Sequence, residues 1–398
     1  MDKSVNKTKA GSKDLRIAIV GAGLGGTVAA IFLQRAGYNV RIYEQATAIA
    51  RIGAGISLGP HIMRIMRALG LEQAMMNVGV VPRERLSREG GAGRVILSMP
   101  VDKFPELYGA NHLIIHRGDM QEMLTAAVAP GTLELGKRLV DLAETDTEVT
   151  LRFADGSQAE ADLVIGADGI NSVVRELLFG ASPPIYSGTV AYRSIFPTAL
   201  LNGLKVPDHT KWWVGDRHIL IYFLTHSRDE IYFVTGVPEP WGSDSFAPMP
   251  ADMEQLRATF ADFHPEVRQV LAASPQATRW PILERDPFRP WSRARVVLIG
   301  DACHAMRPHM GQGAAMAIED AVVLARCIEH FEGHDHPAIF KHYEDLRFDR
   351  TTAIHEGSAH NKFLRNSNED PSWIYGHDVL TQPLVPPSQA ADRVAQTA

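Results

Sequence analysis

The sequence has few cysteines, no long apolar run and no excess of basic residues. Its only two cysteines, Cys303 and Cys327, are too few for a disulfide framework or a cysteine metal cluster and fit a reducing compartment. No apolar stretch approaches the roughly 18 residues that a membrane span needs. A formal net charge of −6 offers no basic face to a nucleic acid. We therefore expect a cytoplasmic protein with no membrane, nucleic-acid or metal site.

Length and composition favour an ordinary folded chain. With 398 residues, 45% hydrophobic and 22% charged, the chain can form two structural domains, or one large domain with an insertion. The polar, lysine-bearing start has no apolar core, which excludes a signal peptide and predicts a disordered leader over residues 1–14. The end, residues 382–398, is rich in Pro, Ser, Ala and Gln and is expected to be loose.

A dinucleotide-binding pattern opens the ordered part. The strand Leu15–Val20 leads into the glycine-rich turn Gly21–Gly26 and a helix, and a second strand, Asn39–Tyr43, closes with Glu44. This is a βαβ unit with a G-x-G-x-x-G turn and an acidic residue about 20 residues further on. The glycines allow a tight turn and close approach of a pyrophosphate, and Glu44 can accept hydrogen bonds from ribose hydroxyls. The predicted cofactor-binding residues here are Gly21, Gly23, Gly25, Gly26, Glu44 and Gln45.

Two later segments repeat a strand, a glycine-rich turn and a helix. Asp162–Leu177 carries Gly166-Ala167-Asp168-Gly169 at such a junction. In Val296–Leu324 an apolar strand ends at Gly300-Asp301, a loop with Pro308 follows, and Gly311-Gln312-Gly313 opens an alanine-rich helix. Free N–H groups at that helix start favour negative charge. Alone, this segment could also be an ordinary strand–loop–helix.

The middle of the chain is β-rich. Between Thr189 and Val237, His218–Thr225 and Glu230–Val237 are expected to pair as a hairpin. His218 and Tyr222 are four residues apart, so on a strand their side chains share one face.

Together these motifs resemble the FAD-dependent aromatic hydroxylases, the superfamily of para-hydroxybenzoate and salicylate hydroxylases. The resemblance spans nearly the whole chain. Within the superfamily it is greatest to the 6-hydroxynicotinate 3-monooxygenases, on Arg51–Pro60, Ile115–Asp119, Pro184–Ala191, Lys211–Trp213, Tyr232–Pro238 and Arg307–Met310.

The resemblance implies a mixed α/β fold: a Rossmann-like FAD-binding domain interwoven with a β-sheet substrate domain, and C-terminal helices. The expected divisions are 15–80, 110–180 and 292–335 for the FAD-binding domain, 81–109 and 181–291 for the substrate domain, and 336–381 for the helical region. The oligomeric state, monomer or homodimer, stays open.

The resemblance also implies the cofactors. The single G-x-G-x-x-G binds FAD, so NADH, or NADPH, docks transiently, and Asp168 is associated with both nucleotides. Arg117 would contact the FAD phosphates, although it could also be a surface arginine at a helix start. Asp301 would hold the ribityl hydroxyls, and the helix beginning at Gly311, Gly313 and Ala314 would lie by the flavin pyrimidine edge, where reduced flavin carries negative charge.

In such enzymes reduced flavin and O2 form a C4a-hydroperoxide, a weak electrophile that needs an electron-rich ring and a site that excludes water. The substrate should therefore carry a hydroxyl or amino group that a base can deprotonate. Tyr222 or His218 could take the proton or hold the hydroxyl; alternatively both only pack the sheet. His309 could bind a carboxylate or ring oxygen. Weaker candidates are His304 for loop hydrogen bonding, and Arg193 and Lys211-Trp212 for carboxylate and ring contacts.

Ser57 departs from the resemblance, because the 6-hydroxynicotinate enzymes have an acid–base histidine at the matching position. Serine cannot act as a base near neutral pH without a partner. The proton path then runs through Tyr222 and His218, or Ser57 only hydrogen-bonds flavin or substrate, or the substrate differs.

The expected reaction is decarboxylative 3-hydroxylation of 6-hydroxynicotinate to 2,5-dihydroxypyridine with NADH and O2. Another aromatic acid, of the salicylate or hydroxypicolinate type, is the nearest alternative. More distant alternatives are an NAD-dependent dehydrogenase that uses the single Rossmann unit, and a flavoprotein without catalytic activity.

Overall fold

The computed structural model describes residues 12–51, 53–243, 245–332, 335–361, 363, 365 and 370–384. Ser12–Asp14, at the end of the expected leader, form a 3-10 turn, while residues 1–11 of that leader and 385–398 of the expected tail lie outside the described residues. Within the described ranges, every helix is too short or too polar to cross a bilayer.

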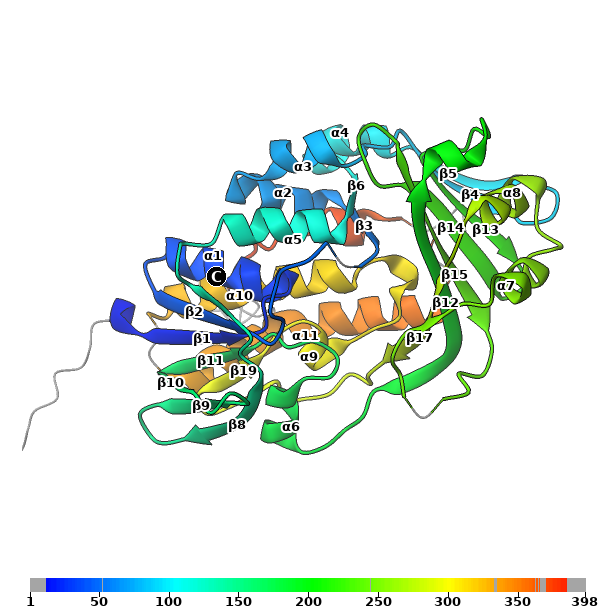
Figure 1. The fold of residues 1–398 in the computed structure, drawn as a ribbon. Helices are drawn as coiled ribbons and strands as arrows, with labels where there is room; N and C mark the ends of the chain where they lie inside the picture. Colours follow the sequence, from blue (N-terminus) through cyan, green and yellow to red (C-terminus); the bar gives the residue numbers. More distant parts are fainter. Residues whose placement is uncertain are drawn as a thin grey trace, which may run out of the picture.

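A six-stranded sheet forms one half of the molecule (Figure 1). Its strands are parallel except for the β18–β19 pair. Because carboxyl ends of parallel strands meet at one edge, the predicted Gly21, Glu44, Asp168 and Asp301 gather there. The sheet order is β18 (Ser292–Arg293), β19 (Val296–Leu298), β11 (Leu163–Gly166), β1 (Arg16–Val20), β2 (Asn39–Glu44) and β7 (Leu133–Leu135).

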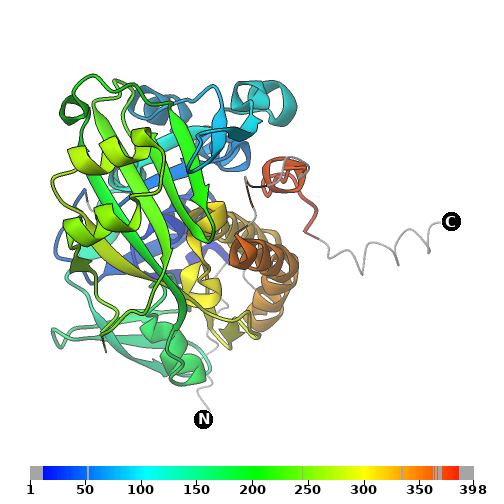
Figure 2. The same ribbon diagram turned by 90° about the vertical axis from the view of Figure 1, so that its right-hand side faces the viewer.

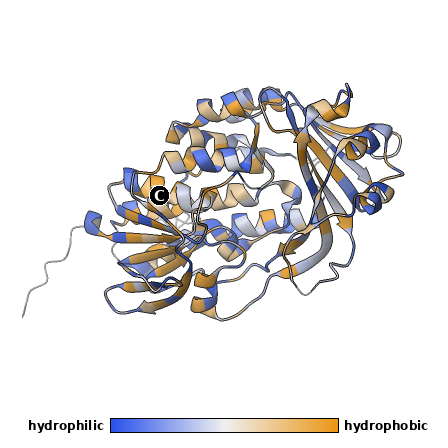
Figure 3. Ribbon diagram, in the orientation of Figure 1, coloured by the Kyte–Doolittle hydropathy of each residue, from blue (hydrophilic) through white to orange (hydrophobic). Residues whose placement is uncertain are grey.

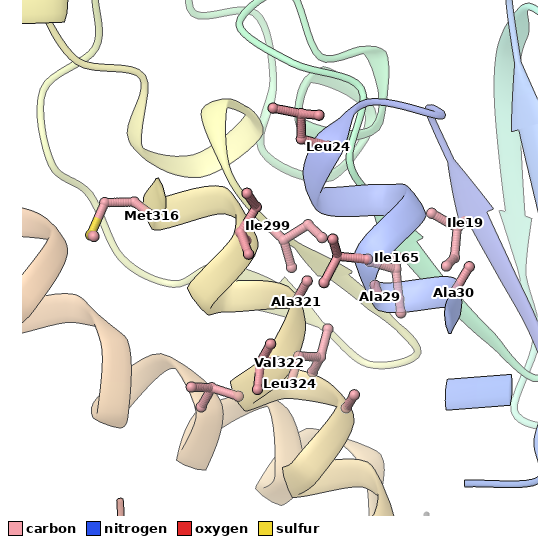
Figure 4. Close-up of a cluster of buried hydrophobic side chains, with 14 of the residues drawn as sticks. Ile19, Leu24, Ala29, Ala30, Ile165, Ile299, Met316, Ala321, Val322 and Leu324 are labelled. Atoms are coloured by element: carbon pink, nitrogen blue, oxygen red, sulfur yellow. The ribbon is translucent and has the colours of Figure 1, made fainter. Parts of the chain in front are cut away.

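Helices α1 (Leu24–Arg35) and α10 (Gly313–His330) pack against each other beside this sheet. Figure 4 shows Ile19 and Ile165 of the sheet meeting Ala29 of α1 and Ala321 of α10 in one apolar cluster. A Cβ at Gly25 would lie 3.0 Å from the carbonyl oxygen of Ala317. Gly25 therefore allows the close helix–helix contact.

An eight-stranded sheet forms the other half, with α7 (Met253–Thr259) and α8 (Pro265–Ala273) on its outer face (Figures 1 and 2). Apolar side chains of α7 and α8 pack with Trp212, Ile219 and Phe233 there. The sheet order is β16 (Met249–Pro250), β17 (Thr278–Glu284), β12 (Ile185–Pro197), β15 (Glu230–Pro238), β14 (Arg217–Phe223), β13 (His209–Val214), β4 (Arg85–Glu89) and β5 (Val95–Met99).

The opposite face of this sheet carries the predicted His218 and Tyr222, as their spacing requires. Ladder pairing places Trp213 opposite His218 and His209 opposite Tyr222, so all four side chains lie on that face. The hydropathy colouring shows hydrophobic stretches along the strands of both large sheets (Figure 3).

The remaining elements cover the edges and join the halves. The short pair β3 and β6 carries Ser57 and leads into α5. The bounds are β3 (Gly55–Leu58), α2 (Pro60–Leu69), α3 (Glu72–Val78), η2 (Val101–Lys103), α4 (Phe104–Tyr108), β6 (Leu113–His116), α5 (Arg117–Ala126), β8 (Leu139–Glu144), β9 (Val149–Phe153), β10 (Gln158–Ala161), α6 (Val173–Phe179), η3 (Thr198–Leu201), α9 (Asp301–His304), η4 (Pro308–Met310), α11 (His336–His360) and α12 (Ser372–Tyr375).

A buried ionic network ties α11 to α10. The Arg347 guanidinium donates to Glu319 and Asp320, each at 2.7 Å, and all three side chains are fully buried. Burial raises the pKa of Glu319, but Arg350 and Arg347 outweigh it and hold that pKa below its ordinary value. Asp320 also accepts the Gly300 N–H at 2.9 Å. The network therefore fixes the turn that precedes Asp301.

Replacing Arg347 with Met should lower the free energy of unfolding by about 3–5 kcal/mol, because two buried carboxylates lose their counter-ion. Denaturant unfolding of the purified protein measures this loss. Arg152→Met, which breaks an exposed pair with Asp141, should cost less than ~1 kcal/mol. Equal stability of the two variants would contradict the structural role of the network.

Candidate functional site

A cavity of about 220 Å³ opens at the carboxyl edge of the six-stranded sheet. It brings together residues from β1, β2, α5, β8 and the turn after β11. Six predicted cofactor residues line it: Gly21, Gly23, Glu44, Gln45, Arg117 and Asp168. Gly169, the next residue of the Asp168 motif, lines it as well.

The glycines of the first turn have different tasks. Gly21 has φ +103°, and a Cβ there would lie 2.5 Å from the carbonyl oxygen of Ala167. A Cβ at Gly26 would overlap the carbonyl oxygen of Gly21, so this glycine lets α1 approach β1. Gly23 differs, because a Cβ there would meet nothing within 4 Å. Its backbone faces the cavity, which leaves room for a pyrophosphate.

Glu44 is held at the cavity wall. Its two carboxylate oxygens accept the backbone N–H groups of Ala22 and Ala46, each at 2.8 Å. A carboxylate oxygen can accept more than one hydrogen bond, so both oxygens can still receive ribose hydroxyls.

Positive charge surrounds the same cavity. Arg117, the first residue of α5, is exposed, and no carboxylate of the described chain forms an ion pair with it. Lys137 also lines the cavity but is paired with Asp155 at 2.8 Å. The free guanidinium fits a diphosphate, which favours the cofactor reading of Arg117 over a plain surface arginine.

Asp168 has a structural task as well as a place in the cavity wall. Its carboxylate accepts the Ser172 hydroxyl at 2.5 Å and the Val174 N–H at 3.0 Å, which caps α6. Burial raises the pKa of Asp168. Its carboxylate therefore stabilises the turn. Only the lone pairs that do not accept these two hydrogen bonds can accept a hydrogen bond from a nucleotide.

Asp301 begins α9, and no described residue donates a hydrogen bond to its carboxylate. The side chain is open to solvent on one side, while desolvation by the surrounding protein raises its pKa. Gly311, with φ +67°, leads into α10, whose N-cap Gln312 makes no side-chain cap. The amides at Gly313 and Ala314 are thus left for a ligand. An acceptor beside free donors fits the ribityl chain and polar ring edge of a flavin.

The predicted catalytic side chains meet where the two halves of the molecule face each other. His309, in the loop before α10, packs edge-on against His218 with ring centroids 5.4 Å apart. Tyr222 stacks on His209 at 5.7 Å, and a Cβ at Gly55 would lie 2.7 Å from the Tyr222 hydroxyl. The sheet face and the cofactor loops therefore share one site.

The protonation states of these groups follow from their burial. Desolvation raises the pKa of Tyr222 well above 10 and lowers that of His218 well below 6.5. Burial likewise lowers the pKa of His309 to about 4. Near neutral pH, Tyr222 is a hydrogen-bond donor and both imidazoles are neutral.

Ser57 has a hydrogen-bond partner that could let it take part in proton transfer. Its Oγ lies 2.7 Å from Nε2 of His112, and burial holds the pKa of that histidine well below 6.5. Neutral His112 can accept the hydrogen bond of the Ser57 hydroxyl. The Ser57 Oγ is then free to accept a hydrogen bond from the substrate. Sequence reasoning missed His112, as it missed Asn361, whose Nδ2 lies 3.4 Å from Nδ1 of His218.

The weaker candidates Arg193, His304 and Trp212 have contacts that do not place them against the substrate. Arg193 packs over Trp280 with its guanidinium carbon 5.1 Å from the ring. His304 Nε2 donates to the Asp320 carboxylate at 2.5 Å and supports the Gly300 turn. Trp212 faces the α7–α8 side of the sheet and not the site.

Cys303, His304 and Asp320 bring possible ligand atoms within 4.8 Å of one another. Both oxygens of Asp320 already accept N–H groups, and burial raises the pKa of Cys303 well above 9. A protonated thiol and an engaged carboxylate are poor metal ligands. The trio fits a hydrogen-bonded support for the turn.

Comparison with known proteins agrees with this geometry. The sequence model of the FAD binding domain matches residues 14–358. The chain is 49% identical to 6-hydroxynicotinate 3-monooxygenase of Bordetella bronchiseptica over 94% of this chain and 98% of the relative. It is 44% identical to the enzyme of that name from Pseudomonas fluorescens, over 96% and 99%.

Solved structures give the same class. A salicylate hydroxylase substrate complex superposes with a TM-score of 0.79 at 27% identity, covering 92% of this chain and 96% of that one. Klebsiella pneumoniae HpxO in complex with FAD and uric acid also has a TM-score of 0.79 at 27% identity, covering 93% and 98%. Both neighbours share the Rossmann-like FAD-binding fold of this chain.

The chain belongs to the FAD-binding domain family and is an FAD-dependent monooxygenase. Its bound cofactor is FAD, which the cavity and the free donors at α10 fit. The Rossmann-like α/β fold expected from the sequence is confirmed.

Asp301→Ala should lower the FAD content of the purified protein, because the carboxylate is a free acceptor beside the cofactor loops. Visible flavin absorbance relative to protein measures occupancy. Asp141→Ala, which removes an exposed carboxylate whose partner, Arg152, does not line the cavity, is the control and should keep its flavin. Normal holoprotein from the Asp301 variant would rule out the predicted ribityl contact.

Proposed function

We propose that this enzyme hydroxylates a hydroxylated pyridine or benzene carboxylic acid, and that its reaction is decarboxylative 3-hydroxylation of 6-hydroxynicotinate to 2,5-dihydroxypyridine with NADH and O2. The main support is that His309 of the cofactor loop packs on His218 of the sheet, while Tyr222 of the same sheet face lies against Gly55 of β3, the strand that carries Ser57. Relatives at 49% and 44% identity carry the name of that activity.

FAD, once reduced, supplies the activated oxygen, and the protein must hold the ring and move its proton. His309 Nδ1 lies 3.0 Å from the Ser358 carbonyl oxygen, so this nitrogen carries the hydrogen and donates it. Nε2 of the same ring is therefore a lone-pair acceptor, and it has no partner among the described residues. It can receive the proton of the substrate hydroxyl.

Tyr222 complements that acceptor. Because its pKa lies well above 10, its hydroxyl stays protonated and can donate to the oxyanion that forms on the ring. The Ser57–His112 pair offers a second acceptor on the β3 side. The three groups would keep the ring electron-rich, which an electrophilic oxygen requires.

Product analysis tests the proposal. Incubated with NADH and O2, the holoenzyme should convert 6-hydroxynicotinate to 2,5-dihydroxypyridine and carbon dioxide, with one NADH consumed per product. Salicylate and hydroxypicolinates belong in the same screen, because Ser57 stands where the relatives are expected to have histidine. NADH oxidation with no hydroxylated product from 6-hydroxynicotinate would refute the substrate assignment.

Tyr222→Phe and Ser57→Ala should each retain FAD but lower kcat/KM for hydroxylation about 10-fold or more, since each removes a hydrogen bond that matters most as charge develops. Uncoupled peroxide should rise in parallel. Peroxide and hydroxylated product, measured against NADH consumed, give the coupling. If both variants keep full coupled hydroxylation, the proposed proton path is wrong.

A further inference from the structure

Two buried cations lie side by side on the site face of the eight-stranded sheet. Arg85 is 5% exposed and Lys211 3% exposed. Lys211 of β13 pairs with Ser87 of β4, so Arg85, two residues earlier on β4, is its diagonal neighbour on the same face. His209, two residues before Lys211 on β13 and beside Arg85 in the same register, stacks on Tyr222. The pair therefore borders the place of the substrate ring.

Neither cation has a carboxylate partner within the described part of the chain. Lys211 Nζ donates to Asn361 Oδ1 at 3.2 Å and lies 4.1 Å from the Trp213 ring centroid. Arg85 Nη1 donates to the Tyr375 hydroxyl at 2.8 Å, and its Nε has no partner. Both side chains are held in place by neutral groups.

Burying two neighbouring cations without a carboxylate lowers the stability of the fold unless an anion compensates their charge. By contrast, Arg347, which is fully buried, is matched by two carboxylates, and the buried Arg285 donates three hydrogen bonds to backbone carbonyl oxygens. Unpaired charges in the interior lose hydration without compensation, and neighbouring like charges repel. Burial, with Arg85 and Arg365 nearby, lowers the pKa of Lys211 to about 7. An anion bound between the two cations would remove that penalty.

We propose that Arg85 and Lys211 form the subsite that binds the carboxylate of the substrate. The inference rests on the proposed function only in taking the substrate to be an aromatic acid. Tyr222 and His309 then hold the ring, and the two cations set its orientation so that the carbon bearing the carboxylate, where oxygen enters, faces the flavin loops. A product without its carboxylate loses this contact and leaves more readily than the substrate.

The subsite gives binding a pH dependence. The groups that face Lys211 are Arg85 from β4, His209 and Trp213 from its own strand, His218 from β14, His309 from the loop before α10, and Asn361 and Arg365 from the C-terminal segment. None is an acid that could take the place of the ligand. Affinity for the acid should be highest below pH 7, where Lys211 is charged, and should fall as the pH rises above its pKa.

Binding to oxidised holoenzyme without NADH isolates this step from catalysis. Perturbation of the flavin spectrum gives Kd for two matched pairs, 6-hydroxynicotinate with 2-hydroxypyridine, and salicylate with phenol. Lys211→Met and Arg85→Met should each weaken binding of the acids at least 10-fold and leave the neutral partners unchanged. Arg88→Met is the control, since Arg88 lies on the same strand over Trp212, on the far face.

Thermal unfolding separates a binding role from a structural one. A cation kept for a ligand is not needed for folding, so Lys211→Met should not lower Tm. The proposal is overturned if both variants bind the acids as tightly as the wild type does. It is also overturned if the affinity for the acids and for the neutral partners falls by the same factor. Preference of the wild type for salicylate over phenol, lost in the variants, would support the subsite even if 6-hydroxynicotinate were not the substrate.

Discussion

The Asp320 carboxylate holds together the parts on which cofactor binding depends. It accepts the Gly300 N–H, a His304 ring nitrogen and the Arg347 guanidinium, so one side chain joins a strand end, a short helix and α11. Buried acceptors must be satisfied, and three charged or polar donors satisfy this one. As a result Asp301 and the start of α10 keep fixed positions before any ligand arrives.

Much of the cofactor half could be predicted from the sequence because its signals are local. The strand from Arg16, the glycine turn and Glu44 follow one another within thirty residues or so, and each has its own pattern. The eight-stranded sheet could not be ordered in this way. Its β4–β13 pair joins Leu86 to Thr210, and β12 mixes polar and apolar residues without strict alternation.

The glycines, the two central histidines and the tyrosine of the candidate site could be picked out from the sequence, but the side chains that support them could not. His112 directly precedes the buried strand β6, 55 residues from Ser57, and nothing local marks the contact. Arg85 likewise resembles a surface arginine until its burial is known. Gly25 and Asp168 were expected to bind the cofactor. The structure adds that Gly25 packs against Ala317 and that Asp168 caps α6.

Helix α11 spans both halves of the site. Arg347, towards its middle, holds the turn before Asp301, whereas Ser358 and Asn361 at its end contact His309 and Lys211. About three helical turns separate Arg347 from Ser358, and about four separate it from Asn361. The length of this helix therefore sets the distance between the turn before Asp301 and the acid-binding groups. One inserted residue would rotate Asn361 by about 100° relative to Arg347, so the length of this helix is constrained although most of its surface touches neither ligand.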